Sequence, residues 1–326
     1  MKLNMTGRRK TIAFCLTISC FSFCVVQIGA FIFCSYSAKT QTPLVVNATI
    51  PAGADYYLGY SSGGVDHYEL FHNLDATIDN AREAEVIFLG NSRAKYTFLR
   101  DNLAPYFAEK KMKYYVMGFG YGEGAQFPWA IIKKYNLKPK WVVVATDSDF
   151  FPHLSEFSSS VLKSTIFDAY KFKFETVISF WFRRVLHSLE PYFDISPKQT
   201  DWIEFRSSKD GTILVGAYKG EKSTVSLKIS NAGVNELLDN TSLFQTPVAF
   251  KQYFEKIGAK LIITCIPPSN CDYAAGVAQK LKIPFVVPNT TEFETMDGSH
   301  LTTASSKVFV SEFLAKFDAI AFSKSD

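Results

Sequence analysis

Five short, continuous apolar runs constrain the fold of this 326-residue chain more than any other feature. They are rich in valine and isoleucine, and most are separated by stretches with helical periodicity. Strands that are apolar on both faces are typical of a parallel sheet covered by helices on both sides. The runs are EVIFLG (85–90), KYYVMGF (113–119), KWVVVAT (140–146), AKLIITCI (259–266) and PFVVP (284–288). The pattern predicts an α/β fold, a flavodoxin-like three-layer sandwich with a parallel central sheet.

Helices are expected between these runs, at about 94–110, 124–136, 272–281 and 302–317. Residues 55–84 begin as a loop and then form a helix that leads into the first run.

The alternation stops between about 150 and 245. Residues 150–189 are aromatic-rich and helical, and DWIEFRSSKDGTILVGAYKG (201–220) predicts a β-hairpin with a Lys-Asp-Gly turn. We interpret 150–245 as an α+β insertion that stands over the end of the sheet and covers a site or meets a partner. Its Phe180-Trp181-Phe182 stretch is interpreted as insertion core rather than as a sugar-binding platform.

The N-terminal region differs from the rest of the chain in charge and hydropathy. Residues 1–54 hold five of the 35 basic residues and none of the 31 acidic ones, so the remainder is close to neutral. A near-neutral body lacks the basic surface that nucleic acid requires, and no nucleic-acid partner is expected. Between Lys10 and Lys39 lie 28 uncharged residues, with the apolar stretch at 11–34. This length is sufficient to span a bilayer as a helix.

The basic sequence GRRK before the apolar stretch marks its cytoplasmic flank. We expect a cytoplasmic tail at 1–10, a transmembrane anchor at 11–34, a linker at 35–55 and a periplasmic domain at 56–326. Such a chain is a single-pass protein of the bacterial inner membrane. The alternative is a cleaved signal peptide, because Ser35-Tyr36-Ser37 offers small residues, although signal apolar regions are usually shorter.

Cysteine usage agrees with this topology. Four of the six cysteines lie in the apolar stretch, and only Cys265 and Cys271 fall in the expected periplasmic domain. They either form a disulfide, as an oxidising compartment allows, or remain two free thiols. Neither has metal-ligand spacing with a histidine, so no metal site is expected, and no cofactor is expected either.

A candidate catalytic site is divided between two distant segments. The first is Asn91-Ser92-Arg93, directly after the first apolar run. In an open parallel sheet, active sites form at the carboxyl ends of the strands. A serine at a helix N-terminus there has an outward backbone N–H that is suited to stabilise an oxyanion. The alternative is that Ser92 or Asn91 only caps the helix.

The second segment contains Asp297 and His300, in the loop before the last helix. Of the five histidines, His300 is the one that follows the last apolar run, at the sheet edge where Ser92 is expected. Serine needs a base to become a nucleophile, and a carboxylate three residues before the histidine can orient its imidazole. The alternative is a polar turn that caps the helix.

These motifs resemble those of the SGNH (GDSL-like) hydrolases over about 85–149 and 255–318. Gly90-Asn91-Ser92 is similar to their Gly-Asp-Ser block, Gly120 to the glycine after strand two, and Asp297-Gly298-Ser299-His300 to the C-terminal Asp-x-x-His. Residues 145–149, ATDSD, stand at the third block without its asparagine. The resemblance implies a Ser92, His300 and Asp297 triad. It also implies oxyanion donors at Ser92 and Gly120, with Ser148 or a backbone N–H in place of the asparagine.

The N-terminal anchor and the Gly-Asn-Ser-Arg turn look like the envelope acyl-transfer branch of that family. This implies a membrane-anchored serine esterase or acyltransferase that acts on O-acyl, foremost acetyl, groups of an extracytoplasmic glycan, beside a multi-span membrane acyltransferase. Asn91, Arg93 and Asp147 are candidates for substrate binding, although Arg93 alternatively pairs with a carboxylate. The alternative function is a non-catalytic scaffold subunit of an acylation complex, which the missing asparagine favours.

Overall fold

The structure is a computed structural model that describes residues 55–61, 64–120, 122–147, 150–193, 203–214 and 222–322. The expected tail and anchor, nearly all of the expected linker and Ser148 lie outside these residues. Within the described part of the chain, none of the helices has the length and apolarity that a membrane span requires.

A four-stranded parallel sheet forms the centre of the fold. Its strands are β2 (Val86–Gly90), β3 (Tyr114–Gly118), β4 (Trp141–Ala145) and β8 (Lys260–Thr264), in the order β3-β2-β4-β8. Gly90 lies beside both Gly118 and Ala145, and Ala145 lies beside Thr264, so all four strands end at one edge. Nearly every residue of these strands is buried, as a sheet covered on both faces requires. The predicted parallel α/β sheet is confirmed, and the arrangement is compatible with a three-layer sandwich.

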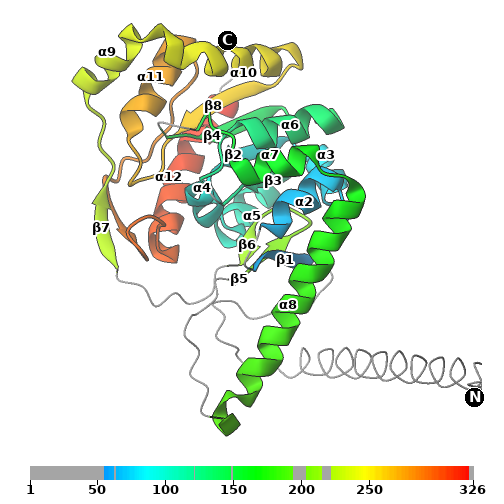
Figure 1. Cartoon of the computed structure of the whole chain (residues 1–326). Helices are drawn as coiled ribbons and strands as arrows, with labels where there is room; N and C mark the ends of the chain where they lie inside the picture. Colours follow the sequence, from blue (N-terminus) through cyan, green and yellow to red (C-terminus); the bar gives the residue numbers. More distant parts are fainter. Residues whose placement is uncertain are drawn as a thin grey trace, which may run out of the picture.

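Two groups of helices pack around this sheet. In one group, α4 (Ser92–Thr97) and α5 (Arg100–Glu109) pack against α12 (Thr303–Ala321), and Phe88 of β2 contacts Phe107 and Phe313 there. In the other, α6 (Gln126–Tyr135) meets α10 (Gln245–Lys256) through Trp129 and Phe250. Helix α11 (Cys271–Leu281) packs against α9 (Asn231–Asp239), as Figure 1 shows in orange and yellow.

Three expected elements differ in the structure. Residues 55–84, expected as a loop and one helix, form a strand at Tyr56–Ser61 and two helices at Val65–His72 and Thr77–Glu83. The PFVVP run makes only one parallel bridge, Phe285 with Ile263 of β8, because its flanking prolines lack the amide hydrogens that would extend a ladder. The single helix expected at about 94–110 is divided into α4 and α5. The division buries Phe98 in the main core and Leu99 in a separate small cluster, which one straight helix would not do.

The segment interpreted as an insertion is held to the rest by a second sheet. The expected hairpin forms from β5 (Ile203–Ser207) and β6 (Ile213–Leu214), and its turn lies along β3, where Val116 N donates to Asp210 O at 2.8 Å. Its third strand, β1 (Tyr56–Ser61), pairs antiparallel with β5. Phe180 is buried against β1 and β5, as the insertion-core interpretation requires, whereas Phe182 is exposed.

Further elements are described outside the central sheet and these two groups of helices. They are α2 (Val65–His72), α3 (Thr77–Glu83), α7 (Glu156–Lys163), α8 (Ile166–Phe193), β7 (Ser223–Ser226), a 3₁₀ turn at Thr241–Phe244 and β9 (Glu292–Thr295). Strands β7 and β9 form an antiparallel pair that directly precedes the Asp297–His300 loop. Helix α8, in green, packs on α2 and projects from the body (Figure 1).

Candidate active site

The carboxyl edge of the sheet gathers the predicted site residues. Helix α4 starts directly after β2, and this close approach depends on glycine at position 90. A Cβ built on Gly90 would lie 2.3 Å from Cβ of Ala94 and 3.2 Å from Cβ of Ala145. The sequence therefore places Ser92 at the first position of a helix that sits tightly on the strand ends.

Ser92, His300 and Asp297 form one hydrogen-bonded chain. The Nε2 atom of His300 lies 3.0 Å from Oγ of Ser92, and its Nδ1 atom lies 2.6 Å from Oδ2 of Asp297. In the arrangement that activates serine, Nδ1–H donates to the carboxylate and Nε2 accepts from the hydroxyl. Two segments that are far apart in the sequence are thus brought within hydrogen-bond reach.

The loop between β9 and α12 fixes this carboxylate. The other oxygen of Asp297, Oδ1, accepts from the backbone N–H groups of Ser299 and His300 at 2.9 and 2.7 Å. Gly298 has φ +78°, a left-handed conformation that side chains disfavour, and it closes the turn. The backbone N–H of Met296 also donates to the carbonyl of His300 at 2.8 Å. Hydrogen bonds to both the backbone and the ring of His300 therefore fix its position.

The electrostatics of the chain suit a general base. Burial lowers the pKa of His300, and the cations Arg93 and Lys95 lower it further, against the opposing effect of Asp297. The net pKa lies below the ordinary histidine value, so the imidazole is neutral at pH 7 and able to accept a proton. Burial would raise the pKa of Asp297, but hydrogen bonds from His300 and two backbone amides outweigh it, so Asp297 stays ionised.

Asn91, Arg93 and Asp147 form a second cluster beside the serine. Asn91 caps α4 by accepting from Arg93 N, and its Nδ2 atom donates to Oδ2 of Asp147 at 2.8 Å. The guanidinium of Arg93 donates to the same Asp147 oxygen at 2.8 Å and to Oγ of Ser269 at 3.2 Å. Asn91 is thus the residue that caps α4, and the hydroxyl of Ser92 contacts His300 instead. Arg93 makes the carboxylate pairing that was one of its two alternatives.

The expected oxyanion donors are described in part. The backbone N–H of Ser92 belongs to the first turn of α4, where amides have no partner within the helix. Gly120 follows β3 at the same edge, and a Cβ built there would lie 3.9 Å from Nζ of Lys95. Ser148 lies outside the described residues, so its predicted role stays a prediction.

A buried charged cluster under the triad was not predicted. Lys95, one helical turn after Ser92, is 2 % exposed and pairs with Glu204 of β5, and Tyr96 also donates to Glu204. The ring of Tyr96 lies 4.6 Å from the His300 ring. The sequence signal for this cluster is in IEFRS (203–207), where Glu204 and Arg206 alternate with apolar residues. Two charged residues on the same face of one strand would have indicated it.

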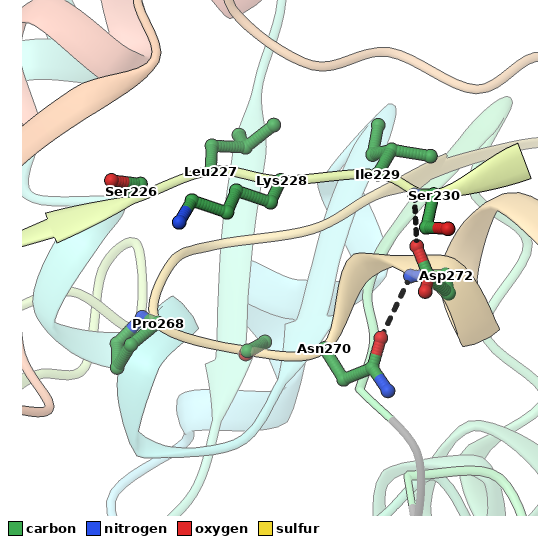
Figure 2. Close-up of a pocket in the computed structure, with 9 residues that line it drawn as sticks. Ser226, Leu227, Lys228, Ile229, Ser230, Pro268, Asn270 and Asp272 are labelled. Carbon is green, nitrogen blue, oxygen red and sulfur yellow. Dashed lines mark hydrogen bonds between the residues drawn. The ribbon is translucent and has the colours of Figure 1, made fainter. Parts of the chain in front are cut away.

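A shallow cavity of about 840 Å³ adjoins the second cluster. It is lined by Ser226, Leu227, Lys228, Ile229, Ser230, Pro268, Ser269, Asn270 and Asp272. In Figure 2, Lys228 extends toward the loop that carries Pro268 and Asn270. The Cys265–Cys271 disulfide closes this loop, and Ser269 in it contacts Arg93, the residue after Ser92. The cavity therefore lies at the sheet edge that carries the triad, and its lining combines polar and apolar side chains.

Fold and site together define an α/β chain with a Ser-His-Asp arrangement at the carboxyl edge of a parallel sheet. No family model matches the chain, and no similar protein was found among curated proteins or solved structures.

Proposed function

We propose that this protein is a membrane-anchored, SGNH-type serine esterase or acyltransferase that acts on O-acyl groups, foremost acetyl, of an extracytoplasmic glycan. The observation that carries the proposal is the hydrogen-bonded chain from Ser92 through His300 to Asp297. A polar turn that only capped a helix would not require the imidazole to reach a serine on another element.

The proposed reaction has two acyl-transfer steps. Oγ of Ser92 attacks the acyl carbonyl carbon while Nε2 of His300 accepts the hydroxyl proton, and Asp297 stabilises the imidazolium that forms. The N–H groups of Ser92 and Gly120 stabilise the oxyanion, with Ser148 as the expected third donor. The imidazolium then protonates the leaving alcohol. In the second step, water or a sugar hydroxyl attacks the acyl carbon while His300 takes its proton. The bond between the acyl group and Oγ of Ser92 then breaks, and His300 returns the proton to Oγ.

The proposed location depends on two features. The apolar stretch at 11–34, with its basic flank, supports an inner-membrane anchor and a periplasmic domain. The Cys265–Cys271 disulfide supports an oxidising compartment, because disulfides are rare in the cytosol. A multi-span membrane acyltransferase that supplies the acyl group remains a proposed partner, by analogy with the envelope branch.

One observation favours a second candidate, a non-catalytic scaffold subunit of an envelope polysaccharide acylation complex. Asp147 stands where the resemblance expects a hydrogen-bond donor, and its carboxylate accepts from Asn91 and Arg93. An ionised carboxylate cannot donate a hydrogen bond to an oxyanion.

Labelling with a fluorophosphonate separates the two candidates. In the purified full chain, the esterase proposal expects covalent labelling of wild type, loss of labelling in Ser92→Ala, and wild-type labelling in Ser299→Ala, a matched control in the histidine loop. An unlabelled but folded wild-type protein, hydrolysing p-nitrophenyl acetate no faster than Ser92→Ala, would favour the scaffold.

A further inference from the structure

Helix α8 exposes a row of large apolar side chains that the proposed reaction does not use. They are Ile166, Phe167, Tyr170, Phe174, Ile178 and Phe182, each between 44 % and 73 % exposed. Isolated exposed apolar residues are normal on a protein surface, but a continuous row of this size marks an interaction site.

The row follows one face of the helix. From Phe167 to Phe182 the spacing is three or four residues, which returns to the same side at each turn. Fifteen residues of helix give this stripe a length of roughly 22 Å. The opposite face is already used, because Phe172 stacks on Tyr68 of α2 and Phe180 packs with β1 and β5. Between Ile166 and Phe182, helix α8 therefore has one apolar face packed on the body and one that is exposed.

Helix α8 is suited to lie on a membrane rather than to cross it. It has 28 residues, yet it is among the described helices that lack the apolarity of a membrane span. Charged residues interrupt it: Lys171 and Glu175 form an ion pair at 4.0 Å and are both exposed. An apolar face rich in phenylalanine beside exposed charges is typical of a helix that rests in the bilayer interface.

The position of α8 relative to the N-terminal stretch also favours a membrane as the partner of the exposed row. The apolar stretch at 11–34 is joined by residues 35–54 to β1, and β1 packs directly against α8 in the cluster of Leu58, Phe180 and Phe205. Twenty connecting residues reach at most about 70 Å when fully extended. Any membrane that holds the N-terminal stretch is thus within reach of α8.

We propose that the stripe from Phe167 to Phe182 docks on the surface of the membrane that holds the N-terminal stretch. The inference depends on the anchor in the proposed function and not on the ester chemistry. Docking would fix the orientation of the catalytic domain at the bilayer, because a single covalent connection does not by itself set that orientation. A second copy of the chain and a protein partner are the competing occupants of the stripe.

Site-specific photo-cross-linking tests this contact in the full chain. Benzoylphenylalanine replaces Phe174 in one variant and Val308 in the control, because Val308 is an exposed apolar residue of α12, away from α8. Each variant is reconstituted into vesicles of phosphatidylethanolamine and phosphatidylglycerol that contain an alkyne-tagged phospholipid. Flotation of the vesicles reports the anchor separately.

The expected result is light-dependent lipid labelling severalfold higher at position 174 than at position 308. Protein that floats with the vesicles but is labelled equally at both positions would overturn the docking contact and leave the anchor intact. A cross-linked dimer without lipid labelling at 174 would assign the stripe to a second copy. Protein that does not float would overturn the anchor and the docking together, while the esterase assay remains unaffected.

Discussion

Replacement of Asp297 by asparagine tests the triad with little change in shape. In the structure, Oδ2 of Asp297 faces Nδ1 of His300 at 2.6 Å, and Oδ1 accepts two backbone N–H groups. An asparagine that keeps its oxygen on the backbone amides must turn its NH₂ group toward Nδ1. Nδ1 of His300 then has to accept a hydrogen bond from this NH₂ group. The imidazole proton therefore moves to Nε2, where it faces Ser92. A histidine in this tautomer cannot take the serine proton.

The expected loss is large because the base is disabled rather than displaced. The same exchange in a serine protease triad lowers kcat roughly ten-thousandfold, which corresponds to about 5 kcal/mol of transition-state stabilisation. We expect a similar fall in the p-nitrophenyl acetate turnover of the full chain, with an unchanged thermal unfolding midpoint. Asp272→Asn, which alters a carboxylate at the rim of the cavity, is the control and should retain activity. A loss below tenfold in folded Asp297→Asn protein would refute the assignment of Asp297.

Three further predictions concern the surroundings of the triad. Because Arg93 lowers the pKa of His300, Arg93→Gln should raise that pKa and move the acid limb of kcat/KM to higher pH; a pH profile with an unmoved or lower limb would contradict this. Gly90→Ala should lower the free energy of unfolding by about 1–3 kcal/mol in urea titrations, because its Cβ has no space, whereas Gly276→Ala, where the nearest atom would be 3.8 Å away, should not lower it. Glu204→Gln should cost about 3–5 kcal/mol in the same titration, because it leaves a buried lysine without its nearest carboxylate; an unchanged midpoint would contradict the pairing.

The central sheet could be predicted because its signals are local. Each of the strands β2, β3, β4 and β8 is a continuous apolar run bounded by helical sequence, and such a run leaves few alternatives. In the second sheet, the β5–β6 hairpin could be predicted from its local turn signal. Its pairing with β1 could not, because β1 pairs with β5 across more than a hundred residues and no local pattern specifies such a partner. The PFVVP run was assigned to the sheet by its apolar residues, but its prolines limit it to one bridge.

Some contacts of the candidate site could also be predicted from the sequence, and others could not. The sequence predicts that Ser92 and His300 meet, because each follows an apolar run and parallel strands end at one edge. The partner of Asp147 was not predicted, since a pairing between the turns after β2 and β4 depends on the order of the strands. The contact between Lys95 and Glu204 depends on the position of β5 in the second sheet, and it was not predicted either.

These unpredicted contacts connect the second sheet to the residues around Ser92 and His300. Glu204 of β5 accepts from Tyr96, whose ring packs against His300, and it pairs with Lys95 on the helix that begins with Ser92. Strand β5 in turn lies between β1 and β6, and β1 packs against α8. Separation of Lys95 from Glu204 is costly, because both groups are buried and would lose part of the compensation of their charges. If α8 docks on a membrane, the orientation that it imposes would therefore extend through β1 and β5 to α4, the helix that begins with Ser92.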